Sequence, residues 1–201
     1  MSSKAIKDAE DIFRQNNGLL RTRQALDLGI DRPTLARMID AGVLACESRG
    51  VYRLVAQQPL SNPDLVIVAL RVPSAVFCLI SALNYYDLTT QIPYQVYFAL
   101  PRGTKAPRLD YPPVDVIHFS EIPYSAGIEE HTIDGVTVRI YCREKTIADC
   151  FKFRNKVGQD VAIEALKDYL RQPGHDIRKL LEYAAINRVS NIILPYLKGS
   201  L

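Results

Sequence analysis

The stretch LRTRQALDLGIDRPTLARMIDAGVLACESRGVYRLV, residues 20–55, constrains the fold more than any other part of the chain. Its apolar spacing predicts a short helix over residues 22–28, which Gly29 ends. A second helix is expected to follow, because Asp31 is a good N-cap and Pro33 suits the first turn, where a missing N–H costs nothing. Two short helices separated by so few residues predict a helix-turn-helix.

A β-hairpin is expected directly after these helices. Residues 43–47 and 51–55 alternate in hydrophobicity and are rich in Val, Leu and Tyr, and Arg49-Gly50 lies at the bend. Residues 4–16 are expected to form an amphipathic helix before the motif. The order of helix, helix, helix and hairpin predicts a winged helix-turn-helix.

The second helix of the motif has a face suited to reading DNA. At about 100° per residue, a helix would turn Leu35, Met38 and Ile39 inward. The outward face, with Thr34 at its edge, is then expected to carry Arg32, Pro33, Thr34 and Arg37. The N-terminal residues of a recognition helix enter the major groove, so Arg32, Thr34 and Arg37 are expected to enter it, and Pro33 on the same face is a further candidate DNA contact.

Further DNA contacts are expected from the start of the preceding helix and from the hairpin. Side chains at a helix start are well placed to hold phosphate, which indicates Arg21, Thr22 and Arg23. The hairpin would contribute Ser48, Arg49 and Arg53. An alternative stays open, because small three-helix domains with a hairpin also serve as protein-interaction modules and surface arginines are often only solvated.

The charge balance permits a nucleic-acid partner without requiring one. The net charge is +3 over 201 residues, and residues 1–58 hold nine Lys and Arg against seven Asp and Glu. Any DNA-binding surface must therefore depend on where a few arginines lie.

The segment AQQPLSNPD, residues 56–64, predicts a domain boundary, with a winged helix-turn-helix over 1–57 and a mixed domain over 58–201. Asn62 is expected to cap a helix over 63–71, and Ser74 one over 75–87. Strands are expected over 95–100 and 114–119, a hairpin over 129–142, and helices over 143–153, 158–171, 176–187 and 189–198. The fold class is therefore α+β, with a mixed α/β second domain that has a helical C-terminus.

Two further groups of cations have two interpretations each. Lys145, Asp149, Lys152, Arg154 and Lys156 form either a basic surface or the polar face of an amphipathic helix. A proline-rich loop carries Arg102, Lys105 and Arg108, which would extend a DNA surface or belong to a solvated loop.

An enzyme is not expected. Glu129, Glu130, Asp134 and Glu144 with Lys145 suggest a nuclease, but Glu129 and Glu130 are adjacent on a predicted strand and point to opposite faces. No glycine-rich phosphate loop and no zinc-type cysteine spacing is present, so no catalytic residue, metal or cofactor is expected. The four cysteines are expected to be reduced and buried. No signal peptide or membrane-length apolar run is found, which indicates a cytoplasmic protein.

The N-terminal segment resembles the winged-helix domain of the AbiEi family, the antitoxin and regulator half of type IV toxin–antitoxin (abortive infection) pairs. The matching residues are NNGLLRTRQALDLGIDRPTLARMIDAGVL followed by RGVYRL. Downstream, REKTIADCFKFRNKVGQDVAIEALKDYL (143–170) is similar to the family's C-terminal domain, and IPYQVYFALPRGTKAPR (92–108) fits it as well.

The resemblance implies an antitoxin that binds inverted repeats in its own promoter and represses its operon, with a role in phage defence. It also implies a partner, a nucleotidyltransferase-like toxin of the AbiEii type, antagonised directly or indirectly. A monomer in solution and a dimer on DNA are both compatible with this. Two alternatives remain, a toxin-neutralising interaction module with secondary DNA binding, and a stand-alone winged-helix regulator.

Overall fold

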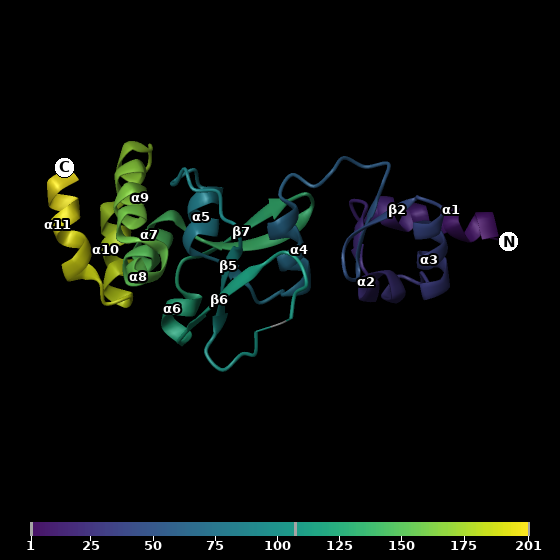
Figure 1. The fold of residues 1–201 in the computed structure, drawn as a ribbon, viewed down its shortest axis with the longest axis horizontal. Helices are drawn as coiled ribbons and strands as arrows, with labels where there is room; N and C mark the ends of the chain where they lie inside the picture. Colours follow the sequence, from purple (N-terminus) through teal and green to yellow (C-terminus); the bar gives the residue numbers. More distant parts are fainter. Residues whose placement is uncertain (1, 107, 201) are drawn as a thin grey trace. The chain divides into compact units, whose positions relative to one another are not determined.

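The computed structural model describes residues 2–106 and 108–200, and the chain forms two compact units (Figure 1). The first unit holds the residues up to 73 together with 132–137, and the second holds 74–131 and the residues from 138 onward.

The first unit contains the predicted winged helix-turn-helix. Its first three helices are α1 (Ser2–Gln15), α2 (Thr22–Asp27) and α3 (Arg32–Asp40). An antiparallel sheet in the order β1-β3-β2 joins them, with strands β1 (Leu19–Arg21), β2 (Leu44–Ser48) and β3 (Val51–Leu54). The sequence did not predict β1, because three residues are too few to show an alternating pattern.

The core of this unit corrects the predicted orientation of α3. Leu35 and Met38 are buried as predicted, but Ile39 is 36% exposed and Thr34 is only 5% exposed. The helix packs against both α1 and β2, so its buried stripe is centred nearer Thr34 than the helical wheel placed it. The predictions that Ile39 packs inward and that Thr34 lies on the outward face are therefore wrong.

A fourth helix, α4 (Pro63–Arg71), also belongs to the first unit. Asn62 caps it as predicted, since its side-chain oxygen accepts from the amide of Leu65 at 3.3 Å. The helix contacts β2, and the carboxylate of Asp134 accepts from the amide and hydroxyl of Ser61 at 2.8 and 3.1 Å. The compact unit thus extends past residue 57 and includes the segment before α4.

The second unit is built on a mixed sheet in the order β6-β5-β4-β8-β7. Its strands are β4 (Val76–Phe77), β5 (Val96–Pro101), β6 (Val114–Phe119), β7 (Ile128–Ile133) and β8 (Val136–Tyr141). Strands β5 and β6 are parallel, as are β4 and β8, whereas β4 and β5 are antiparallel. The strands and the hairpin predicted here are confirmed.

The helix predicted over residues 75–87 is wrong in its first half. Val76 and Phe77 form strand β4, and α5 (Leu79–Tyr85) begins only after Cys78, so Ser74 is not its cap. Val76 pairs with Ala99 of β5. The apolar run suits either a helix or a buried strand, and pairing in the sheet decides the outcome.

Helices make up the rest of the second unit. They are α6 (Glu121–Ser125), α7 (Arg143–Lys152), α8 (Arg154–Val157), α9 (Gln159–Arg171), α10 (Ile177–Ile186) and α11 (Ser190–Ser200). Helix α7 is the central one, because it contacts α5, α8, α9, α10 and α11 and is buried from Glu144 to Phe151. Figure 1 shows α7 to α11 gathered at one end of this unit.

Among the described residues, no helix combines the length and hydrophobicity needed to cross a membrane. The four cysteines are free thiols. Cys78, Cys142 and Cys150 are buried as predicted, but Cys46, in the middle of the short strand β2, is exposed.

Candidate nucleic-acid interface

The start of α3 is fixed by a short chain of hydrogen bonds. The carboxylate of Asp31 accepts from the backbone amide of Thr34 at 2.7 Å, as an N-cap should. Hydrogen bonds from the side chain and backbone of Thr34 lower the pKa of Asp31. Asp31 is therefore ionised near neutral pH, and its negative charge interacts favourably with the positive N-terminal end of the helix dipole.

Arg37 is held against the first turn of the same helix. Its Nη2 donates to the hydroxyl of Thr34 at 2.8 Å, and its Nε donates to the carbonyl of Pro33 at 3.2 Å. Arg37 itself is exposed, as are Arg32 and Pro33, whereas Thr34 lies beneath them. The structure thus presents the two arginines and the proline outward, and gives Thr34 a supporting position.

The tip of the hairpin is tied to the start of α2. The amide of Thr22 donates to the carbonyl of Gly50 at 2.9 Å. Gly50 has a φ of +77°, and a Cβ at this position would lie 3.0 Å from the Thr22 hydroxyl oxygen. A glycine therefore permits the close approach that sets Arg49 beside α2.

An open cleft of about 440 Å³ lies in the first unit at this junction. Four arginines line it together with Thr22, Gly50 and Tyr52, namely Arg21, Arg23, Arg49 and Arg71. Within the described parts of the chain, Arg21, Arg49 and Arg71 form no salt bridge, and Arg23 is 3.9 Å from Asp27, where both side chains are largely exposed. The cleft is therefore a concave site of uncompensated positive charge.

The sequence did not single out Arg71. It lies at the end of α4, twenty-two residues after the hairpin tip, and its Nη1 donates to the carbonyl of Arg49. A lone arginine at the end of an apolar helix is an ordinary feature, and only the tertiary contact of α4 with β2 brings it to the cleft.

Two of the predicted DNA-contact residues, Arg53 and Ser48, have side chains that are largely buried within the first unit. The Arg53 side chain is only 14% exposed, because its Nε pairs with Glu47 and its Nη1 donates to the carbonyls of Leu54 and Gln57 at 3.0 and 2.9 Å. The hydroxyl of Ser48 is buried. Ser48 was expected at the hairpin tip, but the strands pair up to Ser48 and leave only Arg49 and Gly50 in the turn. Arg53 lies on the returning strand, as expected, with its guanidinium bonded within the hairpin.

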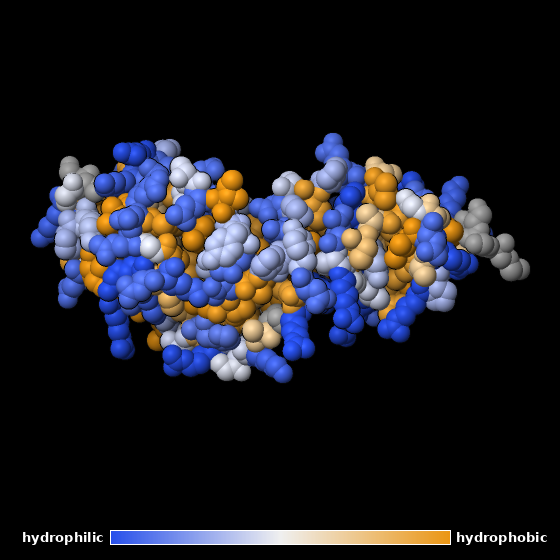
Figure 2. All heavy atoms as spheres, in the orientation of Figure 1, coloured by the Kyte–Doolittle hydropathy of each residue, from blue (hydrophilic) through white to orange (hydrophobic). Residues whose placement is uncertain are grey.

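In Figure 2, deep-blue hydrophilic side chains project from the first unit on the side where Figure 1 places α2 and α3. The surface of the first unit is therefore hydrophilic on the side where these two helices lie.

Only some of the cations predicted to form a basic surface on the second unit are exposed and unpaired in the described part of the chain. Lys145 and Asp149 are fully buried and paired with each other at 2.6 Å, so they belong to the core. Lys156 pairs with Asp115 at 2.7 Å, and Arg154 donates to the carbonyl of Phe151 at 3.0 Å. The remaining predicted cations, which are not in salt bridges in the described part of the chain, are Arg102, Lys105, Arg108 and Lys152.

The carboxylates considered for a nuclease are spread over the second unit and the hairpin tip. Glu144 is buried and accepts from the hydroxyl of Tyr169 at 2.7 Å, and Asp134 binds Ser61. In the described residues, His, Cys, Asp and Glu form no group able to hold a metal ion.

Comparison with known proteins identifies the N-terminal segment. Residues 7–55 match the family model described as "Transcriptional regulator, AbiEi antitoxin". These residues span α1 to β3, which are the elements of the winged helix. The first unit therefore contains a regulator domain of the AbiEi antitoxin family.

The overall fold is also similar to a solved structure. The crystal structure of the RV2827C protein from Mycobacterium tuberculosis superposes with a TM-score of 0.56 at 12% sequence identity, covering 94% of this chain and 79% of that one. At this identity the similarity concerns the fold alone, and it confirms the α+β class over most of the chain. A comparison with curated proteins finds no match.

Proposed function

On the premise that residues 7–55 form an AbiEi-type regulator domain, we propose that the chain binds operator DNA and represses its own operon. The single observation that carries this proposal is the exposed Arg37, held in place on α3 by the buried Thr34. A base-reading arginine has to be accessible, and it gains from being preorganised. Arg37 is accessible because its side chain is exposed, and the hydrogen bond to Thr34 preorganises it.

In the proposed complex, the N-terminal half of α3 enters the major groove. Arg37 and Arg32 present guanidinium groups to base edges, where arginine pairs best with guanine, and Pro33 offers a compact apolar contact. These contacts provide sequence specificity.

The arginine-lined cleft has a different role, which is to hold the phosphate backbone. Its cations are Arg21, Arg23, Arg49 and Arg71, and Thr22 adds a hydroxyl. Phosphate contacts fix the position of a protein on the duplex and make affinity strongly dependent on salt. In this proposal the hairpin is the wing, and Arg49 is the cation at its tip.

We further propose that the protein is an antitoxin for a nucleotidyltransferase-like toxin. The description of the matching family, a regulator that is an antitoxin, supports this role. The second unit has its own hydrophobic core, built around α7, and is the candidate for the antitoxin part. A protein with these partners works in the cytoplasm, where the chromosome lies, and the proposal assigns it no catalytic step.

DNase footprinting of the protein on the DNA upstream of its own gene tests the regulatory proposal. The expected result is two protected half-sites in inverted repeat, spaced by about 10–10.5 base pairs or a multiple of this, because two copies would bind with two-fold symmetry. Uniform protection without discrete sites, or no protection at low salt, contradicts sequence-specific repression.

The antitoxin role is tested separately with full-length variants. Arg37→Ala with Arg49→Ala removes the proposed base and wing contacts without touching the second unit. If the second unit carries antitoxicity, this double variant should rescue growth against the toxin as well as wild type does when expressed from an unrelated promoter. Loss of rescue shows that the two roles are inseparable.

A further inference from the structure

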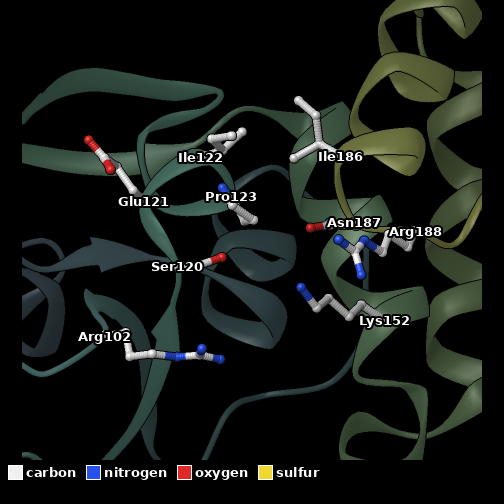
Figure 3. A pocket seen from close by; sticks show the side chains of 9 residues that line it. All are labelled: Arg102, Ser120, Glu121, Ile122, Pro123, Lys152, Ile186, Asn187 and Arg188. Carbon is white, nitrogen blue, oxygen red and sulfur yellow. The ribbon is translucent and has the colours of Figure 1, made fainter.

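A second cleft, of about 720 Å³, lies within the second unit and is lined by three cations (Figure 3). Arg102 follows β5, Lys152 is the last residue of α7, and Arg188 follows α10. Three segments that are far apart in sequence therefore bring positive charge to one place. The volume falls within the range of small-molecule sites, roughly 300–1,000 Å³.

The buried Asp149 acts on Lys152 electrostatically, but this carboxylate is itself paired with Lys145. No salt bridge involves Arg102, Lys152 or Arg188 in the portion of the chain that the structure describes. Figure 3 shows the three side chains pointing toward a common space, whereas the carboxylate of Glu121 at the rim points away from it. Burial lowers the pKa of Lys152, the charge of Asp149 opposes this shift, and the charges of Lys145, Arg188 and Arg102 lower the pKa further.

Lys152 and Arg188 are positioned by their surroundings. The amine of Lys152 lies 5.2 Å from the ring centre of Phe119 and 5.9 Å from that of Phe153, so aromatic faces hold it. Arg188 adopts a φ of 59°, a backbone conformation that usually favours glycine, and its amide donates to the carbonyl of Ala185 at 3.0 Å. An arginine therefore occupies a helix end where a glycine would be the ordinary residue.

The cleft also contains a fixed polar group. Asn187 is 4% exposed, and its Nδ2 donates to Asp149 at 2.7 Å, so its amide orientation is set by the buried ion pair of Asp149 and Lys145. The Oδ1 of Asn187 is buried and has no hydrogen-bond partner in the described residues. Figure 3 shows this oxygen on the cleft side of the residue, but it lies beneath the surface, so Asn187 shapes the floor of the cleft and is not counted among its ligand contacts.

One wall of the cleft is apolar. Ile122, Pro123 and Ile186 line it, and Ile122 is 69% exposed. A DNA backbone needs only cations on an open surface, whereas a small organic phosphate needs cations for its phosphoryl group and an apolar wall for the rest of the molecule. The combination seen here favours the small ligand.

We propose that this cleft binds a small phosphate monoester of nucleotide size. The phosphoryl group lies among Arg102, Lys152 and Arg188, and the organic part packs against Ile122 and Ile186. The site is separate from the proposed DNA-binding surface of the first unit and does not depend on it.

Isothermal titration calorimetry on the full-length chain tests the proposal with a set of nucleoside 5′-monophosphates and the corresponding nucleosides. At least one monophosphate should bind with a stoichiometry of one, and its nucleoside should bind at least about tenfold more weakly, because the phosphoryl group provides the charge-assisted contacts. Lys152→Gln and Arg188→Gln should each weaken binding about tenfold or more. Arg178→Gln, an exposed arginine at the other end of α10, is the matched control and should bind as wild type does.

Three outcomes overturn the proposal. The first is that no monophosphate binds at millimolar concentration, and the second is that Lys152→Gln and Arg188→Gln bind as tightly as Arg178→Gln. The third is that both cleft variants weaken binding to a DNA duplex while no monophosphate binds, which would assign the cleft to nucleic acid. Circular dichroism of each variant separates these results from a loss of fold.

Discussion

The guanidinium of Arg37 donates to the hydroxyl of Thr34, one turn earlier on α3, at 2.8 Å. Thr34 is buried and Arg37 is exposed. The hydroxyl of Thr34, which DNA cannot reach, therefore orients the guanidinium of Arg37, which DNA can reach. The backbone amide of Thr34 also donates to the carboxylate of Asp31, the N-cap of the helix, at 2.7 Å. Helix initiation and the orientation of the proposed base-reading arginine are thus joined in one residue.

Thr34→Val tests this connection, because valine has nearly the same shape but no hydroxyl. Operator affinity should fall several-fold, since Arg37 would lose its hydrogen-bond acceptor and its preorganisation, at about 0.5–1.5 kcal/mol for one hydrogen bond. Fluorescence anisotropy with a labelled operator measures the loss. Thr34→Ser keeps the hydroxyl and should retain most of the affinity, and equal affinity of the Val and wild-type proteins would refute the supporting role of Thr34.

Arg71→Ala tests whether the cleft of the first unit holds phosphate. Binding should weaken to a similar extent on operator and on unrelated DNA, and the slope of log affinity against log salt should decrease by about 1, because one phosphate contact is lost. Arg14→Ala removes an arginine that already pairs with Glu10 and Asp11, so it should leave both quantities unchanged. A loss confined to the operator would show that Arg71 reads bases.

Lys145→Met should destabilise the second unit. The Lys145 amine is fully buried, bonds to both carboxylate oxygens of Asp149 at 2.6 and 2.7 Å, and lies 4.2 Å from the ring centre of Tyr141. Removing one partner leaves an uncompensated buried charge, at a cost of about 3–5 kcal/mol. Urea denaturation of both proteins measures this loss in the free energy of unfolding.

The double variant Lys145→Met with Asp149→Leu is the matched comparison. It removes both charges and should recover part of the lost stability, because no unpaired ion remains in the core. A double variant that is less stable than the single one would show that the hydrogen bond from Asn187 to Asp149 matters more than the charge balance.

Glu144 gives the second unit a dependence on acid pH. Burial raises the pKa of this carboxyl, but the hydroxyl of Tyr169 at 2.7 Å and the charge of Lys179 at 3.3 Å outweigh it, so the pKa lies below its ordinary value of 4.5. A carboxyl with a lowered folded-state pKa stabilises the fold above the unfolded-state pKa, and this contribution disappears as the pH falls through the folded-state pKa.

The stability advantage of wild type over Glu144→Gln should therefore be full at neutral pH and shrink as the pH falls below about 4.5. Unfolding free energies from urea titrations between pH 3 and 7 provide the measurement. An advantage that stays constant over this range would mean that the carboxyl contributes through shape and not through charge.

Local signals in the sequence were enough to predict the winged helix. Asp31 and Pro33 start α3, and the alternation around Arg49-Gly50 marks the hairpin, because caps and turns depend on residues close together in the chain. The burial of Thr34 was missed, since a helical wheel gives relative directions and only the packing against α1 and β2 decides which direction is inward.

The parts of the sites that depend on tertiary contacts could not be predicted. Arg71 reaches the first cleft from another helix, and Arg188 reaches the second from a helix end that no pattern marks. Arg53 was predicted on the DNA side, but its pairing with Glu47 across the hairpin turns it away. Strand β4 was predicted as helix, because two residues carry no periodicity of their own.

The central claim is that α3 and the hairpin tip read operator DNA. Its most direct test is the affinity of the full-length protein for the DNA upstream of its gene, with Arg37→Ala/Arg49→Ala compared with Arg14→Ala at one salt concentration. We expect Arg37→Ala alone to weaken operator binding by about 1–3 kcal/mol, the double variant to lose more, and Arg14→Ala to bind as wild type does. Unchanged operator affinity in a folded Arg37→Ala/Arg49→Ala protein would contradict it.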